Sequence, residues 1–377
     1  GGESVLMPAD HFDEKRSMAD TSLQRYFKAA VAHEASDLLM RGGEKPQLRM
    51  RGKLKALDRV IEETEFEHAV EASLTPKQWQ FYVEHGSVDI GFDLDLGNEG
   101  VHRFRVNVFR TRGRSALAAR RVGKKILTFD DMYLPPALSK VCEHHQGLIL
   151  LAGVTGSGKS TTIASMLDKI NAERSCHIVT IEDPIEFLFI DKKAMINQRE
   201  VGIDVSSFAM GLRALVRENP DVVLIGEMRD KETFEAALQA SETGHLVFGT
   251  IHASSASQAF ARIYDLFPAE ERESVRHLLA YQMQAIIYQK LLPTLLEGVQ
   301  RVPAVEVLLT SPAARKFILD GREGELNEVM RSARDAGMQT FTDALVDLVK
   351  KQYIHPRVAE EAAFNADELK RRLRGIG

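Results

Sequence analysis

The sequence predicts an α/β protein in which a small mixed domain precedes a larger domain built on a parallel β-sheet. Its length of 377 residues suits two or three domains of about 150 residues each. Up to residue 125, short strand-like segments and helical segments are mixed. From Gly147 onward, short apolar strands alternate with longer helical segments, which is typical of a parallel sheet buried on both faces.

The N-terminal domain is expected to begin with a helix, because apolar and aromatic residues recur at helical spacing from Leu23 to Ala32. Gly-rich turns then separate further short segments. We expect strands at 36–40, 46–57 and 86–96 and helices at Glu62–Glu71 and Pro76–Glu84. The domain ends near Lys125, which gives it the range 18–125.

Composition limits what the chain can be. Residues 1–17 are polar and unpatterned, so we expect a flexible native extension or a cloning remnant, with Met18 a plausible native start. A net charge of −5 gives no reason to expect nucleic-acid binding. Cys142 and Cys176 are far apart, which argues against a disulfide framework or structural zinc and suits a reducing cytoplasm. No run of 18 apolar residues exists, so no membrane span is expected.

The second domain is expected to continue as strand, helix, strand to about residue 252. The expected strands are 147–153, 177–183, 221–227 and 245–252, and the expected helices begin at Lys159 and cover 208–219 and 231–244. The tail from Pro312 to Arg374 is mostly helical.

The stretch "GVTGSGKSTT" after the first of these strands fits the phosphate-binding pattern G-x-x-x-x-G-K-[ST]. Glycines let consecutive backbone N–H groups point at phosphate oxygens, and the helix that follows adds its N-terminal dipole. The alternative is a chance match in a Gly-rich loop, but a strand precedes the pattern and a helix follows it. We expect ATP to be bound by Gly153, Thr155, Gly156, Ser157, Gly158, Lys159, Ser160 and Thr161, with the hydroxyl of Ser160 on Mg²⁺.

Polar residues end the strands that follow. In open parallel sheets, ligands bind beyond the carboxyl ends of the strands, so these residues are expected to reach one edge. They are Glu182, Asp183 and Glu186, then Glu227, then Thr250 and His252, while His245 begins the last strand. Carboxylates there can order the water shell of Mg²⁺ or polarise an attacking water. Each acid alone could instead be a helix cap or a solvated loop end.

The segment from Val101 to Lys125 holds nine Arg or Lys residues and no acid. Its apolar residues alternate with polar ones, and Arg112-Gly113 is a turn signal. A turn centred there places Arg105 opposite Arg120 on one face of a hairpin. Three interpretations stand: a solvated basic face, a nucleic-acid surface, or two arginines offered to the γ-phosphate of a neighbouring subunit.

These motifs, with "EASDLLMRGGEKPQLRMRG", "HRFRVNVF", "TIEDPIEF", "NQREVG", "ALVRENPDVVLIGEMRD", "ASETGHLVFGTIHA" and "GMQTF", resemble the bacterial type IV pilus retraction ATPases of the PilT/PilU kind, within the type II/IV secretion ATPase superfamily. The resemblance runs from about Thr21 onward. It implies a PAS-like N-terminal domain at 18–125 and a RecA-like ATPase domain at 126–377, with a helical segment from about 312. It also implies a homohexamer with nucleotide between subunits.

The resemblance assigns roles to residues. Glu186 would be the catalytic base, Glu227 would act on the Mg²⁺ shell, and His245 and His252 would form the family's His box. Arg105 and Arg120 would be its arginine fingers. There are departures: Leu39 stands where the family often has His, and the C-terminal retraction motif is only loosely present at Ala313–Gly321. The last helix, from Ala366, looks more like the PilU side.

The expected function is therefore a cytoplasmic, hexameric motor ATPase, peripheral at the inner-membrane base of the pilus, that drives retraction and twitching motility. Its expected partners are its own copies, a membrane platform protein and a paralogous retraction ATPase. A hinge is expected near Gly123 to Phe129. Rival interpretations are an accessory PilU-like ATPase, an assembly or type II secretion ATPase, a nucleic-acid translocase, and a regulatory module that binds nucleotide without turnover. The absence of a tetracysteine zinc motif disfavours the assembly ATPases.

Overall fold

The computed structural model describes residues 18, 21–123 and 125–375 and divides after Gly123 into two compact units. The expected boundary, between residues 125 and 126, differs from this division by two residues. The expected extension at 1–17, and Lys124 within the expected hinge, lie outside the described residues. Among the described helices, none combines the length and the apolar composition that a bilayer crossing needs.

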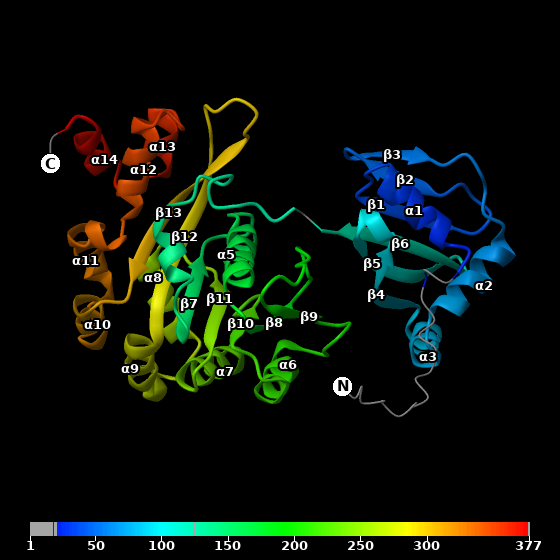
Figure 1. Cartoon of the computed structure of the whole chain (residues 1–377), viewed down its shortest axis with the longest axis horizontal. Helices are drawn as coiled ribbons and strands as arrows, with labels where there is room; N and C mark the ends of the chain where they lie inside the picture. Colours follow the sequence, from blue (N-terminus) through cyan, green and yellow to red (C-terminus); the bar gives the residue numbers. More distant parts are fainter. Residues whose placement is uncertain (1–17, 19–20, 124, 376–377) are drawn as a thin grey trace, which may run out of the picture. The chain divides into compact units, whose positions relative to one another are not determined.

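The N-terminal unit, drawn in blue and cyan in Figure 1, is an antiparallel sheet with helices packed on one face. Its elements are α1 (Gln24–Ala32), β1 (Asp37–Arg41), β2 (Gln47–Met50), β3 (Lys53–Ala56), α2 (Glu63–Ser73), α3 (Pro76–His85), β4 (Ser87–Asp95), β5 (Val101–Thr111) and β6 (Arg114–Val122). The strand order over the described residues is β3-β2-β1-β6-β5-β4. Segment 46–57, expected as one strand, is the hairpin β2–β3, because Arg51 and Gly52 turn the chain with φ of 49° and 80°.

Side-chain alternation gives this sheet two unlike faces. Phe104, Val106 and Val108 of β5 are fully buried under the aromatic residues of α1 and α2. Because successive side chains of a strand point to opposite faces, the alternate residues Arg103, Arg105 and Asn107 belong to the other face. This second face of β5 is therefore polar, in contrast to the apolar face.

The C-terminal unit has a mostly parallel sheet covered by helices on both faces. Its elements are α4 (Ala137–Val141), β7 (Gly147–Ala152), α5 (Lys159–Glu173), β8 (His177–Glu182), β9 (Met195–Glu200), α6 (Phe208–Leu215), β10 (Val222–Ile225), α7 (Lys231–Glu242), β11 (Leu246–Ile251), α8 (Ala256–Asp265), α9 (Arg272–Gln282), β12 (Met283–Pro293), β13 (Arg301–Leu309), α10 (Pro312–Leu319), α11 (Leu326–Ser332), α12 (Phe341–Lys350), α13 (Pro356–Ala362) and α14 (Ala366–Leu373). The order found in the described part is β13-β12-β7-β11-β10-β8-β9, and β13 runs antiparallel to β12. The predicted fold class is confirmed.

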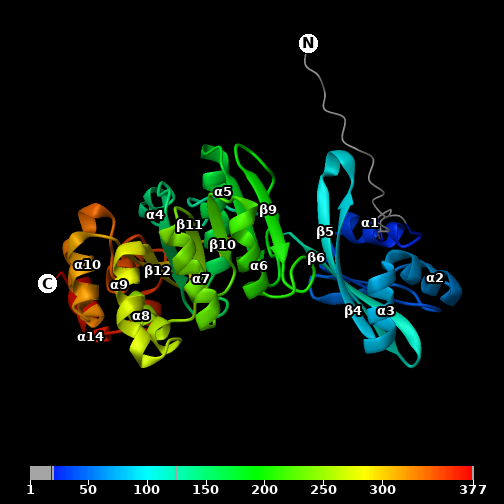
Figure 2. The same ribbon diagram turned by 90° about the horizontal axis from the view of Figure 1, so that it is seen from below.

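Two apolar cores lie on the two faces of this sheet. One core joins α4 and α5 to alternate residues of the central strands, and the other joins α6 to α9 and the C-terminal helices. Figure 2 shows α6 to α9 along the sheet from a second direction. The helices begin where the sequence supplies caps: Ser207, Asp230 and Ser255 each accept a backbone N–H at the start of α6, α7 and α8.

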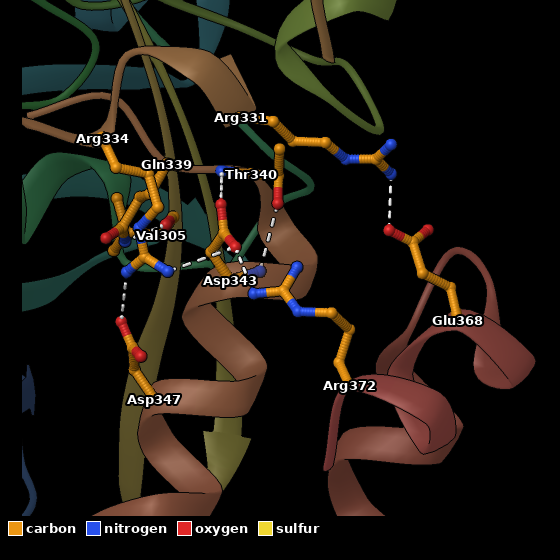
Figure 3. A network of polar contacts seen from close by, with 9 residues as sticks. All are labelled: Val305, Arg331, Arg334, Gln339, Thr340, Asp343, Asp347, Glu368 and Arg372. Atoms are coloured by element: carbon orange, nitrogen blue, oxygen red, sulfur yellow. Dashed lines mark hydrogen bonds and ion pairs between the residues drawn. The ribbon is translucent and has the colours of Figure 1, made fainter. Parts of the chain in front are cut away.

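The C-terminal helices are tied together by ion pairs around Asp343 of α12 (Figure 3). The Asp343 carboxylate is buried and accepts hydrogen bonds from Arg372 of α14 at 2.8 Å, Arg334 at 3.3 Å and the Thr340 backbone at 3.0 Å. Burial alone would raise the pKa of Asp343, but these donors outweigh it and hold the pKa below its usual range. Asp343 therefore links α14 to the body of the unit.

Candidate active site

The phosphate-binding pattern forms a loop between β7 and α5. The strand ends at Ala152, one residue before its expected end, and the helix begins at Lys159, as the sequence predicts. Gly153 adopts a φ of 152°, and a Cβ there would lie 2.5 Å from Oγ of Ser157. The loop can therefore take this path only with glycine at 153.

Lys159 is 9% exposed and lies inside the loop. Its Nζ donates hydrogen bonds to the carbonyl oxygens of Gly153 at 2.8 Å and Val154 at 2.9 Å. Burial lowers the pKa of Lys159, while the carboxylate of Glu227 acts in the opposite direction. Its two partners are backbone carbonyl oxygens. A phosphate oxygen can replace these carbonyls as the acceptor of hydrogen bonds from the Lys159 ammonium.

A cavity of about 480 Å³ opens beside this loop. It brings together the strand-end residues that the sequence singled out and the first turn of α5. Its polar lining comprises Thr155, Lys159, Ser160, Thr161, Glu182, Asp183, Glu186, Glu227, Arg229, Thr250, His252 and Arg301, with Gly156 and Gly158 of the loop. The carboxyl ends of β7, β8, β10 and β11 therefore meet at one place.

Glu227 follows β10 and is held by a histidine and an arginine. His252 Nε2 lies 2.8 Å from one carboxylate oxygen, and Arg229 Nη2 lies 2.5 Å from the other. Burial would raise the pKa of Glu227, but these two partners outweigh it and lower the pKa. Glu227 is thus a fixed anion close to Lys159 and Ser160.

Glu182 and Glu186 flank the cis peptide bond between Asp183 and Pro184. Glu182 is partly buried and accepts hydrogen bonds from Thr180 at 2.7 Å and Gln198 at 3.1 Å, whereas Glu186 is exposed to the cavity. Burial raises the pKa of Glu182 to about 7, aided by the nearby charge of Glu186 and opposed by the two hydrogen bonds. The two carboxyls therefore have unlike environments within one strand end.

Three residues that were predicted to contact nucleotide, Gly153, Ser157 and His245, do not line this cavity. His245 precedes β11 and lies beside Gly147 at the start of β7, whereas His252 follows β11 at the opposite edge of the sheet. Six strand residues separate the two histidines, about 20 Å, so His245 is not part of this cavity. Ser157 is 3% exposed and packs under Gly153, so its side chain supports the loop from within. Neither Ser157 nor Gly153 lines the cavity.

The basic hairpin has the predicted register. Arg112 and Gly113 form the turn, with φ of 52° and 79°, and Arg105 pairs with Arg120. Arg120 Nε donates to Asp37 of β1 at 3.1 Å, and the Arg120 side chain stays 77% exposed. Two adjacent arginines repel each other unless an anion lies near them, and Asp37 of the same unit supplies part of that negative charge. The role of Arg105 and Arg120 as arginine fingers remains a prediction.

Sequence reasoning missed several residues at these sites. Arg229 follows Glu227 by two positions, so a cation just past an acidic strand end was the available signal. Leu291 of β12 and Arg301 of β13 also line the cavity. They belong to a hairpin that no motif in the sequence marks.

The sequence matches the type II/IV secretion system protein family over residues 93–352. It is 39% identical to the type IV pilus retraction ATPase PilT of Pseudomonas aeruginosa, covering 87% of this chain and 94% of that protein. It is 33% identical to the type IV pilus ATPase PilU of the same organism, covering 92% and 90%. A crystal structure of the pilus retraction motor PilT with bound ADP superposes with a TM-score of 0.79 and 42% identity, covering 93% of this chain and all of that one. The chain belongs to the type II/IV secretion system protein family and, within it, to the group of PilT and PilU ATPases.

Proposed function

We propose that this chain is a motor ATPase that drives retraction of a type IV pilus. The observation that carries the proposal is one cavity that joins the phosphate-binding loop to carboxylates from two strand ends. The similarity to PilT, a retraction ATPase by name and solved with ADP, supports the same ligand and the same mechanical output here.

The cavity suits the triphosphate of ATP. Backbone N–H groups of the loop, the N-terminus of α5 and the ammonium of Lys159 would bind its phosphates. A hydroxyl at Ser160 and a carboxylate at Glu227 fit Mg²⁺, which prefers hard oxygen ligands and keeps several waters. When bound, Mg²⁺ would neutralise charge on the phosphate oxygens.

Glu186 is the best-placed base of the cavity. Its exposed carboxylate can orient a water for in-line attack on the γ-phosphate and accept the proton. Lys159 would stabilise the charge that develops on the transferred group. His252 would hold Glu227 in place through their 2.8 Å contact.

Work requires more than one copy. We assign Arg105 and Arg120 to the γ-phosphate of a neighbouring copy within a homohexamer, because these arginines belong to a different unit from the loop. Changes in nucleotide would move one unit against the next in a hinge-type transition. The force would pass to a membrane platform protein at the pilus base, with a paralogous ATPase as a further partner.

Deletion of the gene in the source bacterium separates the alternatives. Loss of retraction with pili still assembled is the expected result, restored by the wild-type gene but not by Lys159→Ala. Loss of pili would instead indicate an assembly motor, and normal retraction would contradict the proposal. ATPase activity of the purified protein that depends on added DNA or RNA and falls steeply with salt would favour a nucleic-acid translocase.

A further inference from the structure

A buried glutamine lies directly beneath the phosphate-binding loop. Gln289 is 2% exposed and belongs to β12, which runs parallel to β7. The register pairs Tyr288 with Ala152, so Gln289 is next to the point where the chain leaves β7 for the loop. Figure 1 shows β12 and β7 side by side in the sheet.

Both ends of the Gln289 amide are used. Its Oε1 accepts the hydroxyl hydrogen of Thr162 in α5 at 2.7 Å, and its Nε2 donates to the carbonyl oxygen of Ser157 at 2.9 Å. A carbonyl oxygen cannot donate, so the amide has only one acceptable orientation. The side chain therefore joins β12, the loop and the first turn of α5 through three buried groups.

The loop is shaped to lie on this residue. A Cβ on Gly158 would be 2.6 Å from Nε2 of Gln289, and a Cβ on Gly153 would be 2.7 Å from its backbone oxygen. Two glycines of the phosphate-binding pattern thus permit close approach to Gln289 as well as a left-handed φ.

The bond to Ser157 has a consequence on the other side of the peptide. The Ser157 C=O and the Gly158 N–H belong to one trans peptide unit, so they point in opposite directions. Fixing the carbonyl toward β12 turns that N–H away from the strand, and Gly158 lines the cavity. An N–H held in place before binding avoids an ordering cost when an anion arrives.

We propose that Gln289 is a positioning residue that presets the phosphate-binding loop for nucleotide. The inference rests on the proposed nucleotide site and assigns to β12 a role that no sequence motif marks. Gln289 does not touch the reacting atoms. Its removal is expected to weaken binding of ADP and ATP alike, because the loop contacts phosphates that both contain.

The test is ADP affinity of the purified full chain, measured by calorimetry below the melting temperature. Gln289→Met keeps length and burial but lacks the amide, and we expect ADP binding about tenfold weaker. In hydrolysis, KM for ATP should rise by a similar factor, while kcat changes by about twofold or less. The matched control is Gln339→Met, which removes another amide that donates to a strand carbonyl, that of Val305 at 2.6 Å (Figure 3); its ADP affinity should equal the wild type.

A second pair of variants tests the same inference if Gln289→Met does not fold. Thr162→Val removes only the hydroxyl that anchors Gln289, and we expect weaker ADP binding that Thr162→Ser largely restores. Wild-type ADP affinity in folded Gln289→Met, or equal losses in Gln289→Met and Gln339→Met, would overturn the inference. These outcomes differ from failure of the proposed function, in which the wild type itself would not bind ADP or drive retraction.

Discussion

Among single residues, the raised pKa of Glu182 can be tested by measuring how the free energy of unfolding changes with pH. Its folded pKa of about 7 lies above the ordinary 4.5, so the folded state binds the extra proton between these values. The stability from Glu182 is therefore fully present below about pH 4.5 and is lost as pH rises through 7, by about 3 kcal/mol.

Replacing Glu182 by Gln keeps a neutral amide at this position and removes that loss. Urea unfolding of wild type and Glu182→Gln between about pH 5 and pH 8 should show the variant gaining stability over the wild type as pH rises. Asp183→Asn, at the exposed neighbouring position, is the control for removing one negative charge from this strand end. A constant difference for Glu182→Gln would mean that Glu182 is ionised throughout this range.

The sequence could predict residues whose position follows from strand direction. Glu186, Glu227 and His252 reach one cavity because parallel strands end at the same edge. The same rule applied to His245 would have excluded it, since that histidine starts a strand. Asp37 and Gln289 could not be predicted, because each acts through a partner far away in the sequence.

At the scale of elements, the attachment of α14 depends on Arg372. Arg372→Ala leaves the buried Asp343 carboxylate with Arg334 and Thr340, and we expect a loss of about 2 kcal/mol at neutral pH. Hydrogen exchange should speed up selectively in α14. The control is Arg371→Ala at the exposed neighbouring position, which should change neither the stability nor the hydrogen exchange of α14.

The pH dependence of this pair has the opposite sign to that of Glu182. Because the folded pKa of Asp343 is depressed, its stability is present above the usual carboxyl range and lost as pH falls through the folded value. The difference between wild type and Arg372→Ala should therefore disappear in strong acid. Protection of α14 that is unchanged at neutral pH would mean that the buried Leu369 and the Arg331–Glu368 ion pair hold the helix without Arg372.

Elements with a clear period were predictable, and those between them were less so. The strand–helix alternation from β7 to β11 follows from apolar runs and capping residues. The pattern does not predict β12 and β13, because buried polar residues interrupt their apolar runs. Glu306 of β13 is 1% exposed and accepts hydrogen bonds from the backbone N–H groups at the starts of α8 and α12, at 2.8 and 3.1 Å. Only the folded chain brings these donors to the buried carboxylate.

For the whole molecule, the proposed mechanism places the chemistry at sites shared between copies of the chain. The loop, Glu186 and Glu227 lie in the C-terminal unit, and Arg105 and Arg120 lie in the N-terminal unit. A ring motor needs such a division, because it lets each copy respond to nucleotide bound by the next. Glu186→Ala and Arg105→Ala should each lose at least about a hundredfold in ATPase activity as assembled proteins. Arg114→Ala, in the same hairpin but paired with Glu63 at 3.1 Å, is the control and should keep it.

The most direct test is the ATPase activity of Glu186→Ala and Arg105→Ala subunits that are dissociated, mixed equally and reassembled. We predict that each variant alone is inactive and that the mixture recovers about a quarter of wild-type activity. In a random equal mixture, about a quarter of the interfaces pair an intact Glu186 with an intact Arg105. A mixture as inactive as its components would place both residues in one copy's site. Near-normal turnover by assembled Arg105→Ala alone would contradict the arginine-finger assignment and return the hairpin to a solvated basic face.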